Sequence, residues 1–304
     1  MTVHISGYTG FIGRNLAPYL SEKGYHIHPI DLRNARMLVF PTQTKAIIHL
    51  AGKAHDVKKA SVPDTYYQVN TELTKKAFDA FLISDAEVFI TLSSVKAVAD
   101  TVSGILTENS RPQPSTHYGK SKRLAEEYIL SKPIPPGKRV YILRPCMIHG
   151  PGNKGNLNLL YSIVSKRVPW PLAAFDNQRS FTSIDNLCFI INELIEQADI
   201  PSGIYQVADD DTLSTNELVT LIGQALHFTP KRWHIPPAII KTISKIGDML
   251  HLPLNTERLN KLTENYVVSN KKIKKALKKK LPLSAKQGVL KTISSFKKNE
   301  TEAN

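Results

Sequence analysis

The sequence has few cysteines and no long apolar segment, and both features limit the classes of protein to which it can belong. Only 2 cysteines occur among the 304 residues; a disulfide framework is therefore not expected, and neither cysteine lies in a metal-ligand spacing. No apolar run reaches the ~18 residues that a membrane span requires. The N-terminus lacks a basic segment followed by an apolar stretch, so we expect no signal peptide. These features predict a globular, cytoplasmic protein without a bound metal or a transmembrane segment.

The charge balance is strongly basic, with a formal net charge of +14. Much of the excess lies in residues 271–280, where Ile273 and Leu277 are four residues apart among lysines. We interpret this segment as a solvated helix face. Weak attraction to an anionic membrane surface or to substrate phosphates is the alternative. No recognition helix, aromatic RNA platform or zinc knuckle is visible, so nucleic acid is not an expected partner.

The first half of the chain alternates short β-rich runs with helical segments. The expected strands are 3–6, 25–30, 46–50, 88–92 and 140–143, and the expected helices are 12–20, 65–82 and 116–130. Such alternation predicts crossover units and a parallel sheet covered on both faces. We therefore predict an α/β fold with a doubly wound, Rossmann-type parallel sheet.

A glycine-rich turn follows the first expected strand. Gly7 permits a tight turn, Gly10 lets the backbone approach a pyrophosphate, and Gly13 lets the next helix pack near the sheet. The helix N-terminus adds unpaired N–H groups and a positive dipole end. The turn predicts a dinucleotide site with cofactor contacts from Gly7, Gly10, Phe11, Ile12 and Gly13.

An acidic residue ends the second expected strand. Asp31 follows Gly7 by 24 residues, near the ~20 typical of the residue that binds the adenosine ribose. A carboxylate there accepts hydrogen bonds from ribose hydroxyls and repels a 2′-phosphate, which favours NAD. Arg33 and Arg36 keep NADP as the alternative, because a guanidinium can pair with a 2′-phosphate.

Composition changes after Arg144-Pro145, and residues 150–153 form a turn cluster. A short helix, a strand or hairpin up to Phe181, a strand at 204–207 and a helix at 212–226 are expected next, and the remainder is mainly helical. We predict an NAD-binding Rossmann domain from 1–145 and 180–210. Residues 146–179 and 211–304 are expected to form a smaller, mainly helical substrate lobe.

Tyr118 and Lys122 are four residues apart in one expected helix and therefore share a face. A nearby ammonium lowers the pKa of a tyrosine from ~10, which would suit Tyr118 to proton transfer near neutral pH. The expected strand 88–92 ends in Ser93-Ser94, at the sheet edge where ligands bind in such folds. Either hydroxyl is a candidate to bond the reacting oxygen. With the glycine-rich turn, this pattern indicates redox chemistry on a nicotinamide cofactor.

At these positions the chain resembles the extended short-chain dehydrogenase/reductases, specifically their NAD-dependent sugar-nucleotide epimerase/dehydratase group. The similarity extends from Gly7 to about Phe296. The matching segments are the glycine-rich turn, residues 49–52, Asn70, Ser93-Ser94-Val95-Lys96, Tyr118-Gly119-Lys120-Ser121-Lys122, Arg144-Pro145, Gly150-Pro151-Gly152 and residues 179–185. One departure is Ala99-Asp100, where many members carry Tyr-Gly.

The resemblance implies residue roles. The implied catalytic residues are Ser94, Tyr118 and Lys122, and Lys122 would also hold the nicotinamide ribose. Besides the glycine-rich turn, Asp31 and Arg33, the implied cofactor contacts are Leu50, Ala51, Gly52, Asn70 and Pro145. The implied substrate contacts are His55, Ser94, Tyr118, Asn156, Leu157 and Arg179, with Arg179 on the diphosphate.

The resemblance also implies a reaction at C4 of a nucleotide hexose or N-acetylhexosamine, UDP-linked, carried out by a homodimer. The main expectation is a 4-epimerase of surface-polysaccharide precursor synthesis. A 4-ketoreductase of a UDP-4-keto-6-deoxy-N-acetylhexosamine is the close alternative, because residues 93–96 and 53–55 resemble that branch. A dehydratase is disfavoured, since no Asp-Glu pair lies beside Ser94. A non-catalytic NAD-binding scaffold is the third hypothesis, and the intact Ser94, Tyr118 and Lys122 argue against it.

Overall fold

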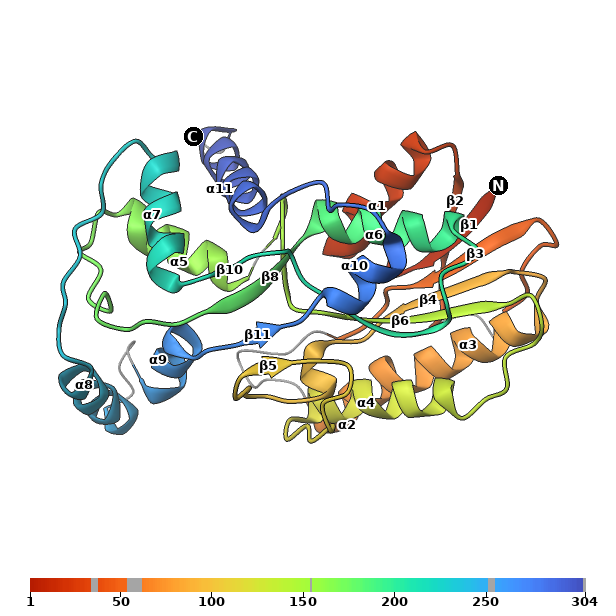
Figure 1. Ribbon diagram of the computed structural model, residues 1–304, viewed down its shortest axis with the longest axis horizontal. Coiled ribbons are helices and arrows are strands. Elements are labelled where there is room, and N and C mark those ends of the chain that lie inside the picture. The colour runs from red at the N-terminus through yellow and green to blue at the C-terminus, as the bar shows by residue number, and fades with distance from the viewer. Residues whose placement is uncertain (34–37, 54–61, 154, 251–254, 303–304) are drawn as a thin grey trace.

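The computed structural model describes residues 1–33, 38–53, 62–153, 155–250 and 255–302 (Figure 1). Arg36 and His55 lie outside the described residues. The main sheet is parallel and has the strand order β2-β1-β3-β4-β6-β9. Its strands are β1 Thr2–Ser6, β2 His26–Ile30, β3 Thr44–His49, β4 Val88–Leu92, β6 Arg139–Pro145 and β9 Gly203–Val207. This topology confirms the expected doubly wound fold.

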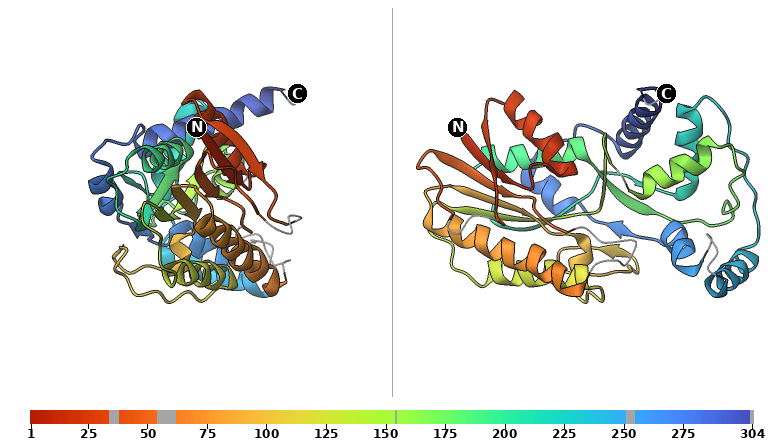
Figure 2. Two further views of the ribbon diagram at one scale, coloured as in Figure 1. Left: turned by 90° about the vertical axis from the view of Figure 1, so that its right-hand side faces the viewer. Right: turned by 180° about the vertical axis from the view of Figure 1, so that it is seen from behind.

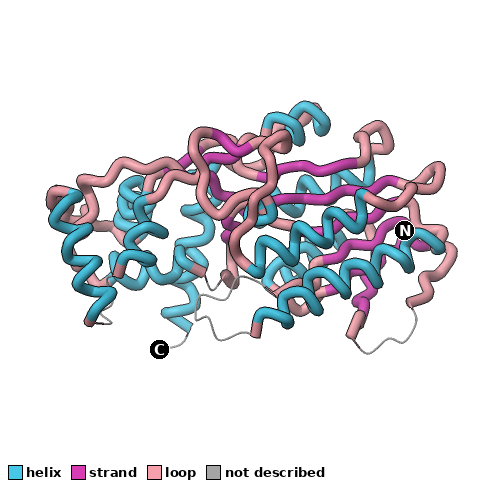
Figure 3. Tube along the Cα trace, turned by 90° about the horizontal axis from the view of Figure 1, so that it is seen from below, coloured by secondary structure: helices cyan, strands magenta, loops and turns pink. Residues whose placement is uncertain are grey.

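Helices cover both faces of this sheet (Figures 1 and 2). The first face carries α1 Phe11–Glu22, α6 Ile184–Glu196 and α10 Lys271–Leu277, which share one apolar cluster with the strands. The second face carries α3 Leu73–Ile83 and α4 His117–Leu130, which pack on Phe89 and Ile142. The helices run along the strands (Figure 3), as crossover connections in a parallel sheet require.

The expected helix 65–82 is helical throughout but changes its winding. It consists of α2 Pro63–Tyr67, a π-helical turn η1 Gln68–Glu72 and then α3. Asn70 lies in the π-helical turn, and such turns occur frequently at functional sites.

The second lobe surrounds an apolar cluster of its own. A three-stranded sheet has the order β10-β8-β7, and a two-stranded sheet pairs β11 with β5. The strands are β5 Ile105–Leu106, β7 Met147–His149, β8 Arg179–Ser183, β10 Thr212–Leu213 and β11 Val267–Val268. The helices are α5 Asn156–Ser165, α7 Thr215–Ala225, α8 Pro237–Met249, α9 Thr256–Thr263 and α11 Ala285–Glu302. Residues from all five helices contribute to the second cluster.

The predicted start of the helix at 212–226 was wrong. Thr212 and Leu213 form β10 and pair with β8, and the helix starts only at Thr215. Ser214 caps it: the Ser214 side chain accepts from the Glu217 N–H, and the Glu217 side chain accepts from the Ser214 N–H. A capping box of this kind defines a helix start, but β10 depends on a distant partner strand. The predicted domain boundaries stay a prediction; β9 belongs to the main sheet, whereas β8 belongs to the small one.

Candidate active site

The glycine-rich turn joins β1 to α1 and approaches the end of β3 closely. Gly7 has φ +71°, and a β-carbon there would lie 2.6 Å from the Ala51 nitrogen. A β-carbon at Gly13 would overlap the carbonyl oxygens of Gly7 and Tyr8. Gly10 is the N-cap of α1, with no side chain to cover the helix N-terminus. The turn therefore leaves an open, positively polarised helix end, which suits a pyrophosphate.

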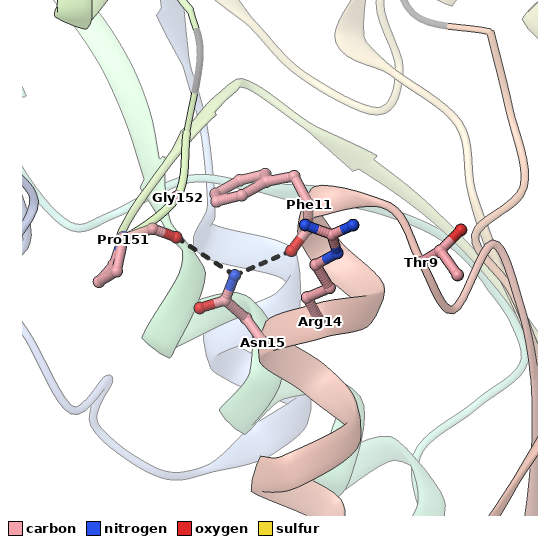
Figure 4. Close-up of a pocket in the computed structure, with 6 residues that line it drawn as sticks. All are labelled: Thr9, Phe11, Arg14, Asn15, Pro151 and Gly152. Atoms are coloured by element: carbon pink, nitrogen blue, oxygen red, sulfur yellow. Dashed lines mark hydrogen bonds between the residues drawn. The ribbon is translucent and has the colours of Figure 1, made fainter. Parts of the chain in front are cut away.

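A pocket of about 290 Å³ lies beside this helix end (Figure 4). It is lined by Thr9, Phe11, Arg14, Asn15, Pro151 and Gly152. The Asn15 side-chain amide donates to the Phe11 carbonyl at 2.8 Å and to the Pro151 carbonyl at 3.4 Å. Asn15 thereby ties α1 to the turn that follows β7. The open helix end, the glycine surface and this pocket together fit a dinucleotide.

Asp31 and Arg33 follow β2 and are exposed at the C-terminal edge of the sheet, next to β1. The Asp31 carboxylate accepts a hydrogen bond from the Arg33 N–H at 3.0 Å. The carboxylate expected at the ribose is thus on the same sheet edge as the glycine-rich turn, as ribose binding requires. The preference for NAD over NADP is still expected to depend on Asp31 against Arg33 and Arg36, of which Arg36 is outside the described residues.

The segment after β3 is held by buried polar groups. His49 lies between Ser6, whose hydroxyl is 2.7 Å from Nδ1, and Thr74, whose hydroxyl is 2.9 Å from Nε2. Burial, and secondarily the charge of Lys122, lowers the pKa of His49 to about 3, so the ring is neutral at physiological pH. The Ser6 hydroxyl also accepts from the Ala51 N–H at 3.3 Å. This network fixes the Leu50-Ala51-Gly52 backbone, which is expected to line the cofactor.

Asn70 is fully buried and binds the backbone on both sides of Lys53. Its oxygen accepts from the Lys53 N–H at 2.8 Å, and its nitrogen donates to the Lys53 carbonyl at 3.1 Å and to the Ser121 hydroxyl at 3.0 Å. A β-carbon at Gly52 would lie 3.1 Å from the Lys122 amine. Asn70 thus holds the Gly52-Lys53 segment against α4. The cofactor contact predicted for Asn70 stays a prediction.

Helix α4 places Tyr118 and Lys122 at the end of β4. Thr116 caps the helix by accepting from the Gly119 N–H at 3.1 Å. The Lys122 amine is buried and donates to the Leu92 carbonyl at 2.8 Å. Burial lowers the pKa of Lys122 to about 8, and Glu126 opposes this shift.

The expectation that Lys122 lowers the pKa of Tyr118 is not met in the structure. Burial is the largest influence and raises the pKa of Tyr118, a hydrogen bond with Ser94 lowers it, and Tyr66 raises it. The Tyr66 and Tyr118 rings lie edge to face, with centroids 6.3 Å apart. The reason is geometric: the Lys122 amine is directed to the Leu92 carbonyl, whereas Ser94 bonds the phenol.

The structure separates the two candidate serines. The Ser93 hydroxyl donates to Glu126 Oε1 at 2.5 Å, while Ser94 bonds Tyr118 and begins the short 3₁₀ helix η2 Val95–Ala97. Ser93 is therefore engaged inside the protein, and Ser94 is the serine at the phenol. Sequence reasoning did not identify Glu126 as the partner of Ser93, nor Arg144 as the second partner of Glu126. Glu126 follows Lys122 by four residues, and this spacing on one helix face was the available signal.

Asp100, the departure from the family pattern, anchors the start of α4. Its carboxylate accepts from the Ser115 N–H at 2.7 Å, the Ser115 hydroxyl at 2.6 Å, the Thr116 N–H at 3.2 Å and the Thr116 hydroxyl at 3.1 Å. These hydrogen bonds and the Lys96 charge outweigh desolvation and lower the pKa of Asp100. Asp100 thus supports the segment directly before Tyr118, a role that sequence reasoning missed.

Arg179 begins β8 and already has partners within the protein. One nitrogen donates to the Lys261 carbonyl, and another lies 3.6 Å from a Glu264 oxygen. Burial lowers the pKa of Arg179, and Glu264 opposes the shift. Nearby, the Lys96 amine lies 4.5 Å from the centre of the Tyr266 ring and donates to the Asp100 carbonyl at 2.6 Å. The Lys96 and Arg179 charges act on each other, so two cations lie near one another here, which suits an anionic substrate group.

Three further predicted contacts lie in β6 and in α5 of the second lobe. Pro145 ends β6, is buried and pairs with Val207 of β9. Asn156 is the first residue of α5, and Leu157 is 3% exposed in the core of the second lobe. The substrate contact predicted for Leu157 therefore falls on a core side chain.

The sheet, the glycine-rich turn and the Ser94-Tyr118-Lys122 group define a Rossmann-type dehydrogenase/reductase. Residues 3–208 match the model of the NAD dependent epimerase/dehydratase family. The chain therefore belongs to this NAD-dependent enzyme family.

Known proteins of this kind resemble the chain over nearly its full length. It is 29% identical to UDP-glucose 4-epimerase from Vibrio cholerae, over 97% of this chain and 95% of that protein. It is 28% identical to N-acetyl-alpha-D-glucosaminyl-diphospho-ditrans,octacis-undecaprenol 4-epimerase from Escherichia coli O157:H7, over 90% and 84%. The solved structure of MoeE5 in complex with UDP-glucuronic acid and NAD has the same fold, with a TM-score of 0.75, 17% identity and coverage of 98% and 100%.

Proposed function

We propose that this protein is an NAD-dependent 4-epimerase of a UDP-hexose or UDP-N-acetylhexosamine. The observation that carries the proposal is the grouping of Ser94, Tyr118 and Lys122 at the sheet edge, beside the open N-terminus of α1. The similarity over nearly the whole length to a UDP-glucose 4-epimerase supports epimerisation at C4. Homodimeric assembly and a cytoplasmic location stay predictions.

Each residue of the group has a chemical task in this proposal. Tyr118 would take the proton of the C4 hydroxyl when the sugar is oxidised, which requires the phenolate, and would return a proton when the sugar is reduced. Burial raises the pKa of Tyr118 and opposes the phenolate, whereas the Ser94 hydrogen bond favours it. Ser94 orients the Tyr118 phenol and bonds the same sugar oxygen. Lys122, held by the Leu92 carbonyl, supplies positive charge beside the expected nicotinamide ribose. NAD, if held by the glycine-rich turn, would supply the hydride-transfer chemistry at C4.

Binding of the cofactor and the substrate is assigned to separate surfaces. The turn around Gly7–Gly13 and Asp31 would hold the dinucleotide, and the segment Leu50–Gly52 would line it. Arg179 would bind the diphosphate of the substrate by exchanging its Glu264 partner for phosphate oxygens. The reaction balances within the protein, because the hydride and the proton removed from the sugar are both returned to it.

The test is to purify the protein without added cofactor, release any bound nucleotide and identify it. UDP-N-acetylglucosamine and UDP-glucose are then assayed with and without NADPH. We expect retained NAD and conversion to the C4 epimer without added reductant. An absolute requirement for NADPH with a 4-keto substrate would instead establish the reductase. Failure to bind any nicotinamide dinucleotide would contradict both.

A further inference from the structure

Lys96 connects the turn that carries Ser94 to the second lobe. The Lys96 backbone N–H donates to the Ser94 hydroxyl oxygen at 3.2 Å, and Ser94 in turn bonds Tyr118. The Lys96 side chain extends in the other direction, and its amine lies 4.5 Å from the centre of the Tyr266 ring. Tyr266 directly precedes β11 and forms an isolated β-bridge with Arg179. Lys96 therefore lies between the serine of the candidate active site and the arginine predicted to bind the substrate.

The half-buried Lys96 ammonium has no direct countercharge. Its hydrogen bond goes to the Asp100 carbonyl at 2.6 Å, which is a neutral acceptor. Among the described residues no carboxylate forms an ion pair with this amine, because the Asp100 carboxylate bonds Ser115 and Thr116 instead. Burial lowers the pKa of Lys96, whereas the more distant carboxylates of Glu264 and Asp100 raise it. Burying a charge is costly unless a partner compensates it, so the arrangement points to an anionic ligand.

A second cation lies in the same region. The charges of Arg179 and Lys261 lower the pKa of Lys96 further. Lys261 is paired with Glu257 at 2.7 Å, whereas Arg179 approaches Glu264 only to 3.6 Å. Glu264 is thus one negative charge for the two cations Lys96 and Arg179, and an excess of positive charge remains. Neighbouring cations repel each other, and an anion bound to both removes that repulsion.

We propose that Lys96 is a substrate-binding residue whose ammonium bonds the sugar-linked phosphate of the nucleotide sugar, beside Arg179. This inference rests on the proposed function, which assigns the diphosphate of the substrate to Arg179. The diphosphate of a nucleotide sugar carries two negative charges, and these match Lys96 and Arg179 once the arginine has exchanged Glu264 for phosphate oxygens. Lys96 follows Ser94, which faces the reacting sugar, so its ammonium is assigned to the phosphate nearer that sugar.

The contacts of the Lys96 ammonium fix its position and still leave donors for a phosphate. An ammonium has three N–H donors, and the Asp100 carbonyl accepts from this one at 2.6 Å. The aromatic face of Tyr266 attracts the cation without neutralising it. Tyr266 is itself held, because its hydroxyl donates to the Ala99 carbonyl at 2.7 Å. The ammonium is therefore positioned before the substrate binds, which reduces the entropy lost on binding.

The test is titration calorimetry of UDP and of UMP into the full-length protein with NAD present. Lys96→Met preserves the length of the side chain and removes its charge. We expect this variant to bind UDP about ten- to a hundredfold more weakly than the wild type, with NAD affinity unchanged. UMP lacks the sugar-linked phosphate, so its affinity should change little. Added salt should weaken UDP binding more in the wild type than in the variant, because the variant has lost one charge.

Lys272→Met is a matched control. The Lys272 amine lies 4.7 Å from the centre of the Tyr205 ring and donates to the Ile204 carbonyl at 2.7 Å. These are the same two kinds of contact that Lys96 makes, but Lys272 belongs to α10 and does not adjoin Ser94. This variant should bind UDP as tightly as the wild type. Circular dichroism and thermal melting show whether each variant is folded.

Three results would overturn the assignment of Lys96 and leave the proposed function standing. The first is equal UDP affinity in the wild type and in Lys96→Met. The second is an equal loss of UDP and UMP affinity, which would indicate a general change of the site. The third is a loss confined to UDP-glucuronic acid, which would place the ammonium at a sugar carboxylate. Absence of UDP binding to the wild type would overturn the proposed function together with this inference.

Discussion

Glu126 and Arg144 form a bidentate ion pair next to the candidate active site, with N···O distances of 2.7 and 2.6 Å. Both side chains are 1% exposed. Glu126 also accepts from Ser93 and lies four residues from Lys122, whose ammonium it favours. The pair therefore joins α4 to β6 at the height of the active site.

Glu126→Gln should destabilise the fold by about 3–5 kcal/mol, because the guanidinium of Arg144 would remain buried without its countercharge. Urea denaturation monitored by circular dichroism measures the free energy of unfolding. Glu127→Gln is the matched control on the same helix; Glu127 is exposed and pairs with Arg123, so its loss should cost under about 1 kcal/mol. If the two substitutions lowered the free energy of unfolding equally, Glu126 would not be the essential buried countercharge of Arg144.

Tyr118→Phe should reduce turnover of the UDP-sugar by about 10²–10⁴-fold while preserving cofactor binding. The substitution removes the oxygen that Ser94 bonds and keeps the ring that packs on Tyr66. Steady-state kinetics and NAD titration measure the two properties. Tyr128→Phe, which removes an exposed hydroxyl bonded to Asp79, is the control and should retain activity. Near-normal turnover in Tyr118→Phe would remove Tyr118 from the mechanism.

Asp100→Asn should destabilise the protein by about 1–2 kcal/mol at neutral pH and lower turnover, because the start of α4 loses charge-assisted hydrogen bonds. The pKa of Asp100 is lowered from 3.8 in the folded protein. Its contribution is therefore complete above 3.8 and is lost as pH falls through the lower folded value. Urea denaturation of the wild type and the variant should be measured at neutral pH and in acid. The difference between their free energies of unfolding should become smaller in acid.

A control distinguishes this positioning role from a general charge effect. Asp85→Asn removes an exposed carboxylate before β4 and should change neither turnover nor the pH dependence of stability appreciably. For Asp100→Asn, we expect kcat to fall with little change in KM, since the substrate contacts remain. A stability gap that persists unchanged in acid would show that the charge of Asp100 is not what supports α4.

Arg179→Ala should weaken UDP binding by about ten- to a hundredfold, the loss of a charge-assisted pair worth roughly 1.5–3 kcal/mol. Titration calorimetry with UDP in the presence of NAD measures this, and NAD affinity should stay unchanged. Glu264→Gln leaves the arginine and removes the carboxylate that competes with phosphate, so UDP affinity should be kept or increased. If UDP binds Arg179→Ala as tightly as wild type, the diphosphate lies elsewhere.

Features that depend on neighbouring residues along the chain could be predicted from the sequence. The parallel strands follow from β-rich runs between helices, the open end of α1 from the spacing of Gly7, Gly10 and Gly13, and the shared face of Tyr118 and Lys122 from helical periodicity. Helix ends were less accurate, and Thr212-Leu213 was misassigned because a two-residue strand is stabilised by its partner strand rather than by its own residues.

Only the tertiary structure decided which serine faces Tyr118 and what Asp100 supports. Ser93 and Ser94 have identical side chains, and they differ because Glu126, 33 residues from Ser93 in sequence, accepts from one of them. Asp100 bonds residues 15 and 16 positions away. Hydrogen bonds and burial between segments that are distant in sequence arise only when the chain is folded. The local sequence therefore determined the helices, the strands and the reactive side chains that they carry. Packing in the folded protein determined which groups those side chains contact.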